Sequence, residues 1–304
     1  MIANLYIPTE SIKHNGTDSD EEVQNKLQSF IKDLIYIQRY KNENIIYFGA
    51  DIYEAFITGD KNIFQLAEIL NYEEKNLIYA IICNTSEMCT CPLNDLIEAC
   101  QIDTDDECTT IIAFNSIEIP STVNYIIYNK TNWFTFRRVM LARHHKNDPN
   151  YFIEECKKYF EELYFHENNK LVIGDFLQKS AIKFINYLTA LNDSFKAYKQ
   201  ENPGLNTNDM LANFSRLHNM DDLASLQGNP SKKPLLTYEF DAILSETHTR
   251  YRKSLICEPH LKICWPDNPT DPDRYNYCAR IYFHFGDNEV HDGKVLIGSI
   301  GPHV

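Results

Sequence analysis

Two stretches near the C-terminal end alternate strictly between apolar and polar residues, and no other feature constrains the fold as much. They run through residues 260–265 and 280–285. The apolar positions are Leu261, Ile263 and Trp265 in the first stretch and Ile281, Phe283 and Phe285 in the second. A period of two is typical of half-buried β-strands. The pattern therefore predicts two strands, each with one buried side and one polar outer side.

A third strand is expected at about residues 294–300. The turn-rich segment 266–274 separates the first two strands, and Asp292-Gly293 before the third is a good hairpin signal. Antiparallel pairing follows, so we expect a small sheet made of about residues 255–265, 277–285 and 294–300. On this interpretation, Gly298 and Gly301 in the third strand leave open space above the polar face.

The rest of the chain has a mixed pattern of helix and strand signals. A helix is expected to start after Ser19 or Asp20, buried strands at residues 77–83 and 110–114, and a long helix from about residue 175. The apolar stripe expected on the long helix consists of Phe176, Leu177, Ile182, Ile185, Leu188 and Leu191. The pattern is too irregular to indicate a doubly wound sheet.

We therefore predict an α+β fold with a mixed N-terminal domain, a helical middle segment and a small antiparallel C-terminal sheet. A linker rich in Asn, Ser, Lys and Pro puts the boundary near residue 230. It divides the chain into residues 1–230, a regulatory or partner-binding body, and residues 231–304, a small sheet domain.

Net charge limits the classes of partner. The chain carries 29 Lys plus Arg against 43 Asp plus Glu, a formal net charge of −14. Residues 1–245 account for −13 of this charge. An acidic surface repels phosphates, which argues against nonspecific nucleic-acid binding by the whole molecule. The last fifth of the chain is nearly neutral and also holds five of the ten histidines, so it differs chemically from the body.

The expected cellular location follows from two patterns that the sequence does not show, a membrane span and a signal peptide. No apolar run approaches the length of a membrane span, and the N-terminus has no signal-peptide pattern. The nine cysteines are odd in number and form no C-x-x-C pair, which favours reduced thiols. We expect a cytoplasmic protein that has no membrane partner.

Residues 131–148 form the most basic segment. Its cationic residues are Arg137, Arg138, Arg143, His144, His145 and Lys146. They are expected to form a solvated helix face and helix end. An acidic partner or a nucleic-acid backbone is the alternative.

The polar side of the C-terminal strands carries the residue types that RNA cleavage requires. Cleavage of a ribose phosphodiester needs a base, an acid and cations for the charge on phosphorus. We predict charge stabilisation by Arg280 and Lys262, and proton transfer by His284, His260, Glu258 or His303. The complete candidate catalytic set is Glu258, His260, Lys262, Arg280, Tyr282, His284 and His303.

Two other interpretations of these residues stay open. Polar residues on the solvent face of a sheet need no function at all. A metal site is the other alternative, with His260, His284 and His303 joined by Glu258 or Asp287, although their spacing selects no metal. The interpretation that we carry forward requires neither metal nor cofactor.

Residues 257–303 also carry a resemblance. The pattern Cys-Glu-x-His-x-Lys, then Arg-Ile-Tyr-Phe-His-Phe, then Gly-Lys-Val-Leu-Ile-Gly-Ser-Ile-Gly-Pro-His resembles the C-terminal end of uncharacterised bacterial proteins associated with phage defence. It is more distantly similar to the closing strands of RelE-type toxins. The resemblance covers about 60 residues and implies a small ribonuclease unit that cleaves RNA without metal. RelE-type toxins are strongly basic, whereas this chain is acidic.

The leading functional prediction is thus a toxin-like or anti-phage defence protein whose C-terminal domain cleaves RNA. The alternative is a non-enzymatic sensor or adaptor whose acidic body binds a basic partner protein. The two differ in their partner, which is RNA in the first and a protein in the second.

Overall fold

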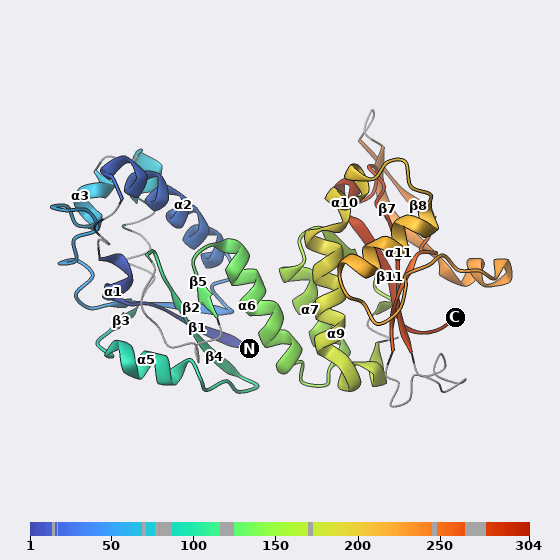
Figure 1. Cartoon of the computed structure of the whole chain (residues 1–304), viewed down its shortest axis with the longest axis horizontal. Helices are drawn as coiled ribbons and strands as arrows, with labels where there is room; N and C mark the ends of the chain where they lie inside the picture. The colour runs from blue at the N-terminus through green and yellow to red at the C-terminus, as the bar shows by residue number, and fades with distance from the viewer. Residues whose placement is uncertain are drawn as a thin grey trace. The chain divides into compact units, whose positions relative to one another are not determined.

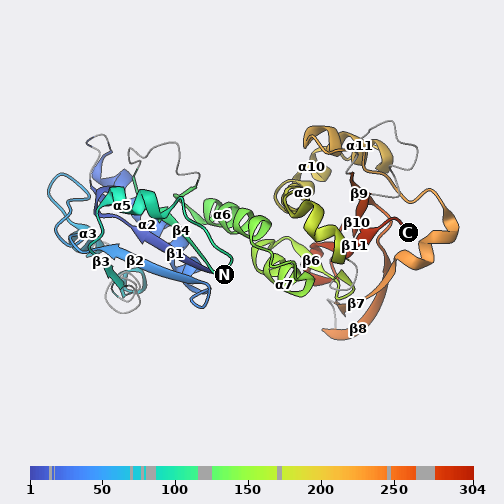
Figure 2. The same cartoon turned by 90° about the horizontal axis from the view of Figure 1, so that it is seen from below.

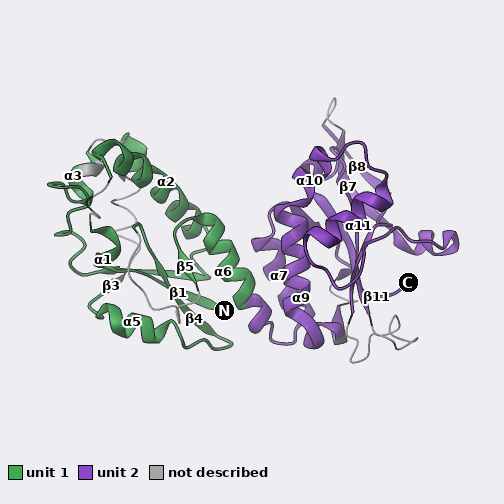
Figure 3. Ribbon diagram, in the orientation of Figure 1, with its two compact units in different colours: residues 1–140 green, residues 141–304 purple. Residues whose placement is uncertain are grey.

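A computed structural model describes most of the chain. The chain separates into two compact units. Unit 1 is Met1–Met140 and unit 2 is Leu141–Val304 (Figure 3). The residues described are 1–13, 16, 18–68, 71–76, 79, 87–115, 125–169, 173–244, 248–264 and 278–304. Within these residues, both units combine helices with sheets, which confirms the predicted α+β class.

Unit 1 contains a five-stranded parallel sheet (Figure 1). Its strands are β1 (Ile2–Ile7), β2 (Asn44–Gly49), β3 (Glu87–Cys89), β4 (Glu107–Ile112) and β5 (Ile126–Ile127). Their order is β3-β2-β1-β4-β5, so the chain winds outward in both directions from β1. This order could not be predicted, because β3 and β5 are only three and two residues long. The strand predicted at residues 77–83 lies almost entirely outside the described residues.

The described part of unit 1 contains several helices, and the one that starts at Asp20 begins where the sequence predicted. They are α1 (Thr9–Ile12), α2 (Asp20–Gln38), α3 (Ile63–Ala67), α5 (Leu93–Ala99) and α6 (Lys130–Arg143). A capping box starts α2: the Ser19 hydroxyl accepts a bond from the Glu22 amide, and the Glu22 carboxylate accepts one from the Ser19 amide. The apolar face of α2 is buried as predicted, through Val23, Leu27, Phe30, Ile31, Leu34 and Ile37.

Two basic residues on α6 are buried instead of solvated, whereas Arg143 at the end of the helix and Lys146 beyond it are exposed as expected. Arg137 is 0% exposed and Arg138 is 4% exposed. The guanidinium of Arg137 donates to the backbone carbonyls of Met1, at 3.1 Å, and Glu43, at 3.4 Å. The prediction of a solvated face was wrong here, because Arg137 supplies hydrogen bonds to carbonyls at the start of β1 and before β2.

Unit 2 is built around a four-stranded mixed sheet of order β6-β11-β10-β9. Its strands are β6 (Leu163–Phe165), β9 (His260–Ile263), β10 (Ala279–His284) and β11 (Val295–Pro302). The three C-terminal strands pair antiparallel as predicted, and the turn before β11 has Asp292 and Gly293 at positive φ. Residue Trp265 of the alternating pattern lies outside the described residues.

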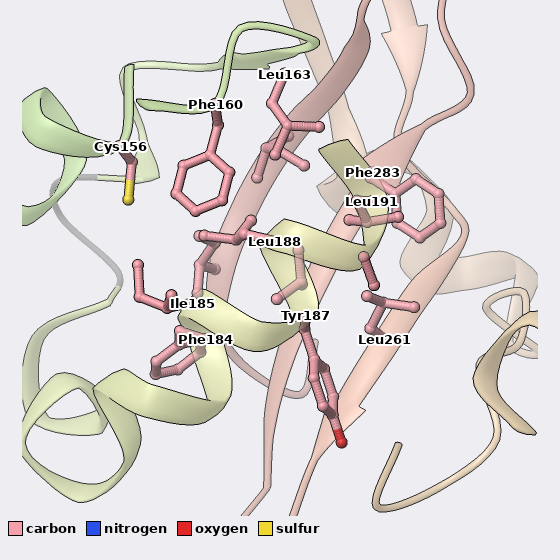
Figure 4. Packing of buried hydrophobic residues seen from close by; sticks show 14 of the residues in the cluster. Cys156, Phe160, Leu163, Phe184, Ile185, Tyr187, Leu188, Leu191, Leu261 and Phe283 are labelled. Atoms are coloured by element: carbon pink, nitrogen blue, oxygen red, sulfur yellow. The ribbon is translucent and has the colours of Figure 1, made fainter. Parts of the chain in front are cut away.

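Helices cover one face of this sheet. They are α7 (Pro149–Tyr159), α9 (Gly174–Asp193), α10 (Phe195–Glu201) and α11 (Thr207–Leu217). Figure 4 shows the apolar stripe of α9 packed against Leu261 of β9 and Phe283 of β10. The predicted stripe is correct apart from Ile182, which is 60% exposed. The alternating apolar residues of the terminal strands therefore face this core, as expected.

The predicted boundary near residue 230 falls inside unit 2. Strand β11 pairs in parallel with β6, with Val295 opposite Leu163. The C-terminal strands also share one core with α7 and α9. Residues 141–230 and 231–304 thus form one compact unit, because β6 completes the sheet and the preceding helices cover it.

A two-stranded antiparallel ribbon covers part of the opposite face (Figure 2). It consists of β7 (Thr237–Leu244) and β8 (Thr249–Ile256) and is preceded by the 3₁₀ helix η1 (Pro230–Leu236). Another 3₁₀ helix, η3 (His291–Gly293), precedes β11. A Cβ atom added to Gly298 would come within 2.6 Å of the Tyr238 ring and 2.7 Å of the Cys257 sulfur. The open space expected above Gly298 is therefore filled, and this half of the polar face is a second core. No helix among the described residues is long and apolar enough to cross a membrane.

Candidate functional site

The polar side of β9 and β10 forms a row of directly opposed residues. The register places His260 opposite Tyr282 and Lys262 opposite Arg280. Cys264 and Cys278 follow one position beyond the pairs that end the two strands, and their sulfur atoms are 2.7 Å apart. Strict alternation on two antiparallel strands accounts for the row, since every second side chain points to the same face.

Burial of this row is the main departure from the sequence prediction. We expected an exposed face, yet Tyr282, Arg280 and His260 are 0%, 2% and 4% exposed. The ribbon and the segment that leads into η1 supply a second layer over the strands. The prediction of an open polar face was therefore wrong, and the row contains ionisable groups in a low-dielectric environment.

Arg280 is a buried cation that has no carboxylate partner among the described residues. Its guanidinium donates from Nη1 to the Ala279 carbonyl of its own strand at 3.1 Å. The buried Nε has no hydrogen-bond partner in the described part of the chain. Buried charges in proteins are ordinarily paired and hydrogen-bonded, because removing them from water costs several kcal/mol. Arg280 thus retains unused capacity to donate hydrogen bonds to an anion.

Lys262 places a second cation directly opposite Arg280. Like charges at opposed positions of an antiparallel pair are destabilising. The Asp222 carboxylate lies 3.9 Å from the Lys262 ammonium, a long separation for an ion pair. The two cations are therefore only weakly compensated by the described residues.

His260 is neutral at physiological pH in this environment. The pKa of His260 is lowered to about 4, mainly by burial and to a smaller extent by the charges of Arg280, Lys262 and His303, while a hydrogen bond with the Glu258 backbone opposes the shift. Its two ring nitrogens lie 3.4 Å from the Ser225 hydroxyl and 3.3 Å from the Glu258 carbonyl. A neutral imidazole held between two hydrogen-bonding groups can accept a proton from a substrate.

His303 adjoins the same charges at the exposed end of the row. Its pKa is lowered first by burial and then by the charges of Arg280, Lys232 and Lys262. His303 follows Gly301, the β11 residue that pairs with Arg280. We call His260, Lys262, Arg280 and His303 the basic cluster. The face also carries Tyr282, whose hydroxyl accepts a bond from the Val304 amide at 3.2 Å.

Two predicted site residues make their side-chain contacts away from the row. The Glu258 carboxylate forms an ion pair with Lys233 at 2.9 Å. His284 accepts a hydrogen bond from the Gly286 amide at 3.2 Å. Burial lowers the pKa of His284, and the neighbouring charge of Asp287 opposes that shift. The structure thus brings five of the seven candidates together and gives these two other partners.

Three residues near the basic cluster were not predicted. Ser225 and Asp222 come from the segment after α11, and Lys232 comes from η1. Ser225 reaches the row because its backbone bridges to that of His260. Nothing in the sequence between α11 and β7 marks this approach, since it depends on a single antiparallel bridge.

The metal alternative has no support from side-chain geometry in the described parts of the chain. No group of three or more His, Cys, Asp or Glu side chains there could hold a metal ion. His284 and Asp287 lie near Lys253, which pairs with Asp287 at 2.7 Å. The histidines of the basic cluster adjoin cations, and cations disfavour a metal ion at the same place.

Comparison with known proteins adds no assignment. No protein-family model matches the chain, and neither a curated protein nor a solved structure matches it. Functional inference therefore rests on the site itself, and the resemblance of the terminal strands to defence proteins and RelE-type toxins stays a prediction.

Proposed function

We propose that unit 2 is a metal-independent ribonuclease and that the basic cluster binds the scissile phosphate of RNA. One observation carries the proposal: Arg280 is buried, has no carboxylate partner among the described residues and lies directly opposite Lys262. A phosphate between these cations would satisfy the free guanidinium donors and remove the repulsion between the two charges. Arginine suits this contact because its planar fork can hold two phosphate oxygens.

The histidines supply proton transfer in this proposal. Neutral His260 takes the proton from the ribose 2′ hydroxyl, which then attacks phosphorus and expels the 5′ oxygen of the next nucleotide. His303 donates a proton to that leaving oxygen, and Arg280 with Lys262 stabilises the charge on the phosphoryl oxygens. A bound phosphate raises the pKa of both histidines, since its negative charge favours imidazolium. This increases the protonated fraction of His303 when substrate is bound.

A toxin-like or anti-phage defence role in the cytoplasm completes the proposal. RNA cleavage inside the cell that makes the protein stops growth, which is the outcome shared by toxins and abortive defence. Support comes from the resemblance of residues 257–303 and from the chemistry of the basic cluster. Induction of the wild-type chain should arrest growth, and Arg280→Met should abolish the arrest at equal protein level.

Cleavage by the purified full-length chain tests the proposal directly. The substrate is single-stranded RNA in a buffer that contains a chelator, and the products are examined for 2′,3′-cyclic phosphate ends. We expect Arg280→Met and His260→Gln each to reduce the rate about 100-fold or more. Arg252→Met is the matched control, because Arg252 pairs with Asp241 at 3.3 Å on the exposed ribbon. Unchanged cleavage by Arg280→Met would contradict the proposal.

Charge distribution favours a second candidate function. Unit 1 carries 21 Asp plus Glu against 10 Lys plus Arg, a balance of −11, whereas unit 2 carries 22 against 19, a balance of −3. An acidic unit 1 suits a sensor or adaptor that binds a basic partner protein. Co-purification of a stoichiometric partner, without nuclease activity in either component, would support this candidate over the ribonuclease.

A further inference from the structure

Unit 1 contains a cavity at the carboxyl edge of its parallel sheet. Its volume is about 610 Å³, within the usual range for small-molecule sites. The cavity is lined by the residues that end or follow three strands: Ile7 to Glu10 after β1, Gly49 to Asp51 after β2, and Cys89 to Pro92 after β3. The start of α5 closes one side through Leu93 and Leu96.

Sheet topology makes this edge the expected position of a ligand. In open parallel sheets, ligands bind outside the carboxyl ends of the strands, where the chain reverses its winding direction. The order β3-β2-β1-β4-β5 places that reversal beside β1. The cavity begins at the end of β1 and extends over β2 and β3. Its place at the carboxyl ends of these strands therefore indicates a binding site.

The charged side chains of the lining are mainly acidic. Among its described residues they are Glu10, Asp51 and Glu54 against a single cation, Lys13. None of the three carboxylates forms an ion pair with a side chain in the described part of unit 1. They remain available as acceptors for hydroxyl or amino groups of a ligand. The same charges, within a unit of net charge −11, repel a phosphate.

The start of the first crossover also lacks a phosphate cradle. Residues 8–12 after β1 read Pro-Thr-Glu-Ser-Ile and include no glycine. Helix α1 is only four residues long, too short to offer a helix N-terminus to a pyrophosphate. Gly49 instead lets Thr9 approach β2, since a Cβ atom there would collide with the Thr9 hydroxyl and come within 2.9 Å of its amide nitrogen. This edge of the sheet therefore lacks the features that hold the pyrophosphate of a dinucleotide.

Two features of the lining suit a nucleoside. In sheets of this order, a carboxylate at the end of the second strand accepts hydrogen bonds from ribose hydroxyls, and Asp51 lies two residues after β2. The rings of Tyr6 and Tyr47 stack at 4.5 Å with an interplanar angle of 11°, and both line the cavity. Aromatic side chains are the usual platforms for nucleobases.

We infer that this cavity binds a ribonucleoside that carries no phosphate, with its ribose hydroxyls on Asp51 and its base beside Tyr6 and Tyr47. The inference is independent of the ribonuclease proposal because it concerns unit 1 alone. It adds a small-molecule site to a protein whose other candidate site handles phosphate.

Titration calorimetry of the full-length chain with adenosine, guanosine, cytidine and uridine tests the inference. We expect at least one to bind with a Kd below about 1 mM, which is weak binding for a small ligand. Its 5′-monophosphate should bind at least about fivefold more weakly because of the carboxylates. Asp51→Asn should weaken binding of the nucleoside about tenfold through loss of a charged hydrogen bond. Tyr47→Leu should weaken it to a similar extent.

Asp60→Asn is the matched control, since Asp60 is an exposed carboxylate of unit 1 that does not line the cavity. It should bind the nucleoside like the wild type. Binding of none of the four nucleosides at 1 mM overturns the inference, as does a monophosphate that binds more tightly than its nucleoside. Spermidine is tested in parallel, and displacement of the nucleoside by it would show that the carboxylates select an organic cation instead.

Discussion

Replacement of Arg280 by methionine should stabilise the protein in the absence of phosphate. The guanidinium is 2% exposed, has no carboxylate partner among the described residues and lies opposite Lys262. Replacing buried charges by apolar residues of similar volume is neutral or stabilises by about 1–4 kcal/mol. Relief of the like-charge pair adds roughly 0.2–1 kcal/mol. A net gain of about 1–3 kcal/mol for Arg280→Met corresponds to a rise in Tm of roughly 2–10 °C for a domain of this size.

Phosphate should reverse this order. A ligand that binds only the folded state adds about 2.7 kcal/mol at 100 times its Kd. Wild-type unit 2 should therefore gain about that much in saturating inorganic phosphate, whereas Arg280→Met should gain little. Urea denaturation of both proteins, in phosphate and in chloride at matched ionic strength, measures the two effects. Arg252→Met controls for the lost charge and should respond to phosphate like the wild type.

The opposite pattern would refute the reasoning. If Arg280→Met loses about 2 kcal/mol or more in chloride, the guanidinium stabilises the apo protein, as an ordinary buried hydrogen-bonding group does. If the wild type and Arg280→Met also gain equally from phosphate, the row of polar residues is structural. Arg280 would then have a structural role in the sheet and would not bind an anion.

Three other predictions follow from the site. His260 should titrate near pH 4 by NMR. Because the pKa of His260 is higher in the unfolded state, the free energy of unfolding should fall by up to about 3 kcal/mol as the pH drops from about 6.5 to 4. An unchanged unfolding midpoint over that range would contradict the burial of His260. Mild oxidation should join Cys264 to Cys278, detected as loss of two hydrogens by mass spectrometry and absent in Cys278→Ser; two thiols that remain free would show that the strand ends are further apart. His284→Gln should keep phosphate binding and RNA cleavage, and a loss of both would return His284 to the site.

The terminal strands show which parts of the structure could be predicted. The alternation of apolar and polar residues predicted β9 and β10 and their buried apolar sides. Leu261 and Phe283, two of these apolar residues, lie in the hydrophobic core. Asp292 and Gly293 identified the turn before β11, since both adopt the left-handed conformation. Each of these signals is local, and each was confirmed.

Long-range pairing could not be predicted from the same residues. The parallel pairing of Leu163 with Val295 joins strands 132 residues apart and moves the unit boundary to residue 140. The strand order of unit 1 was equally hidden, because three-residue and two-residue strands carry no measurable period. Five of the seven candidate site residues lie on one face. The ion pair of Glu258 with Lys233 could not be predicted, because it depends on the position of η1.

Burial of the polar face changes what the row of side chains implies. On an open sheet, Lys262 and Arg280 would be solvated, and their opposition would cost little because water screens the charges. The second layer over the strands removes that screening from Arg280 and leaves its Nε without a partner. A fold in which the guanidinium has only structural value would gain by exchanging it for an apolar residue. An anion held between the Arg280 and Lys262 side chains is the simplest arrangement that compensates for the cost of burying the guanidinium. The phosphate measurements on Arg280→Met therefore decide more than any other experiment on this site.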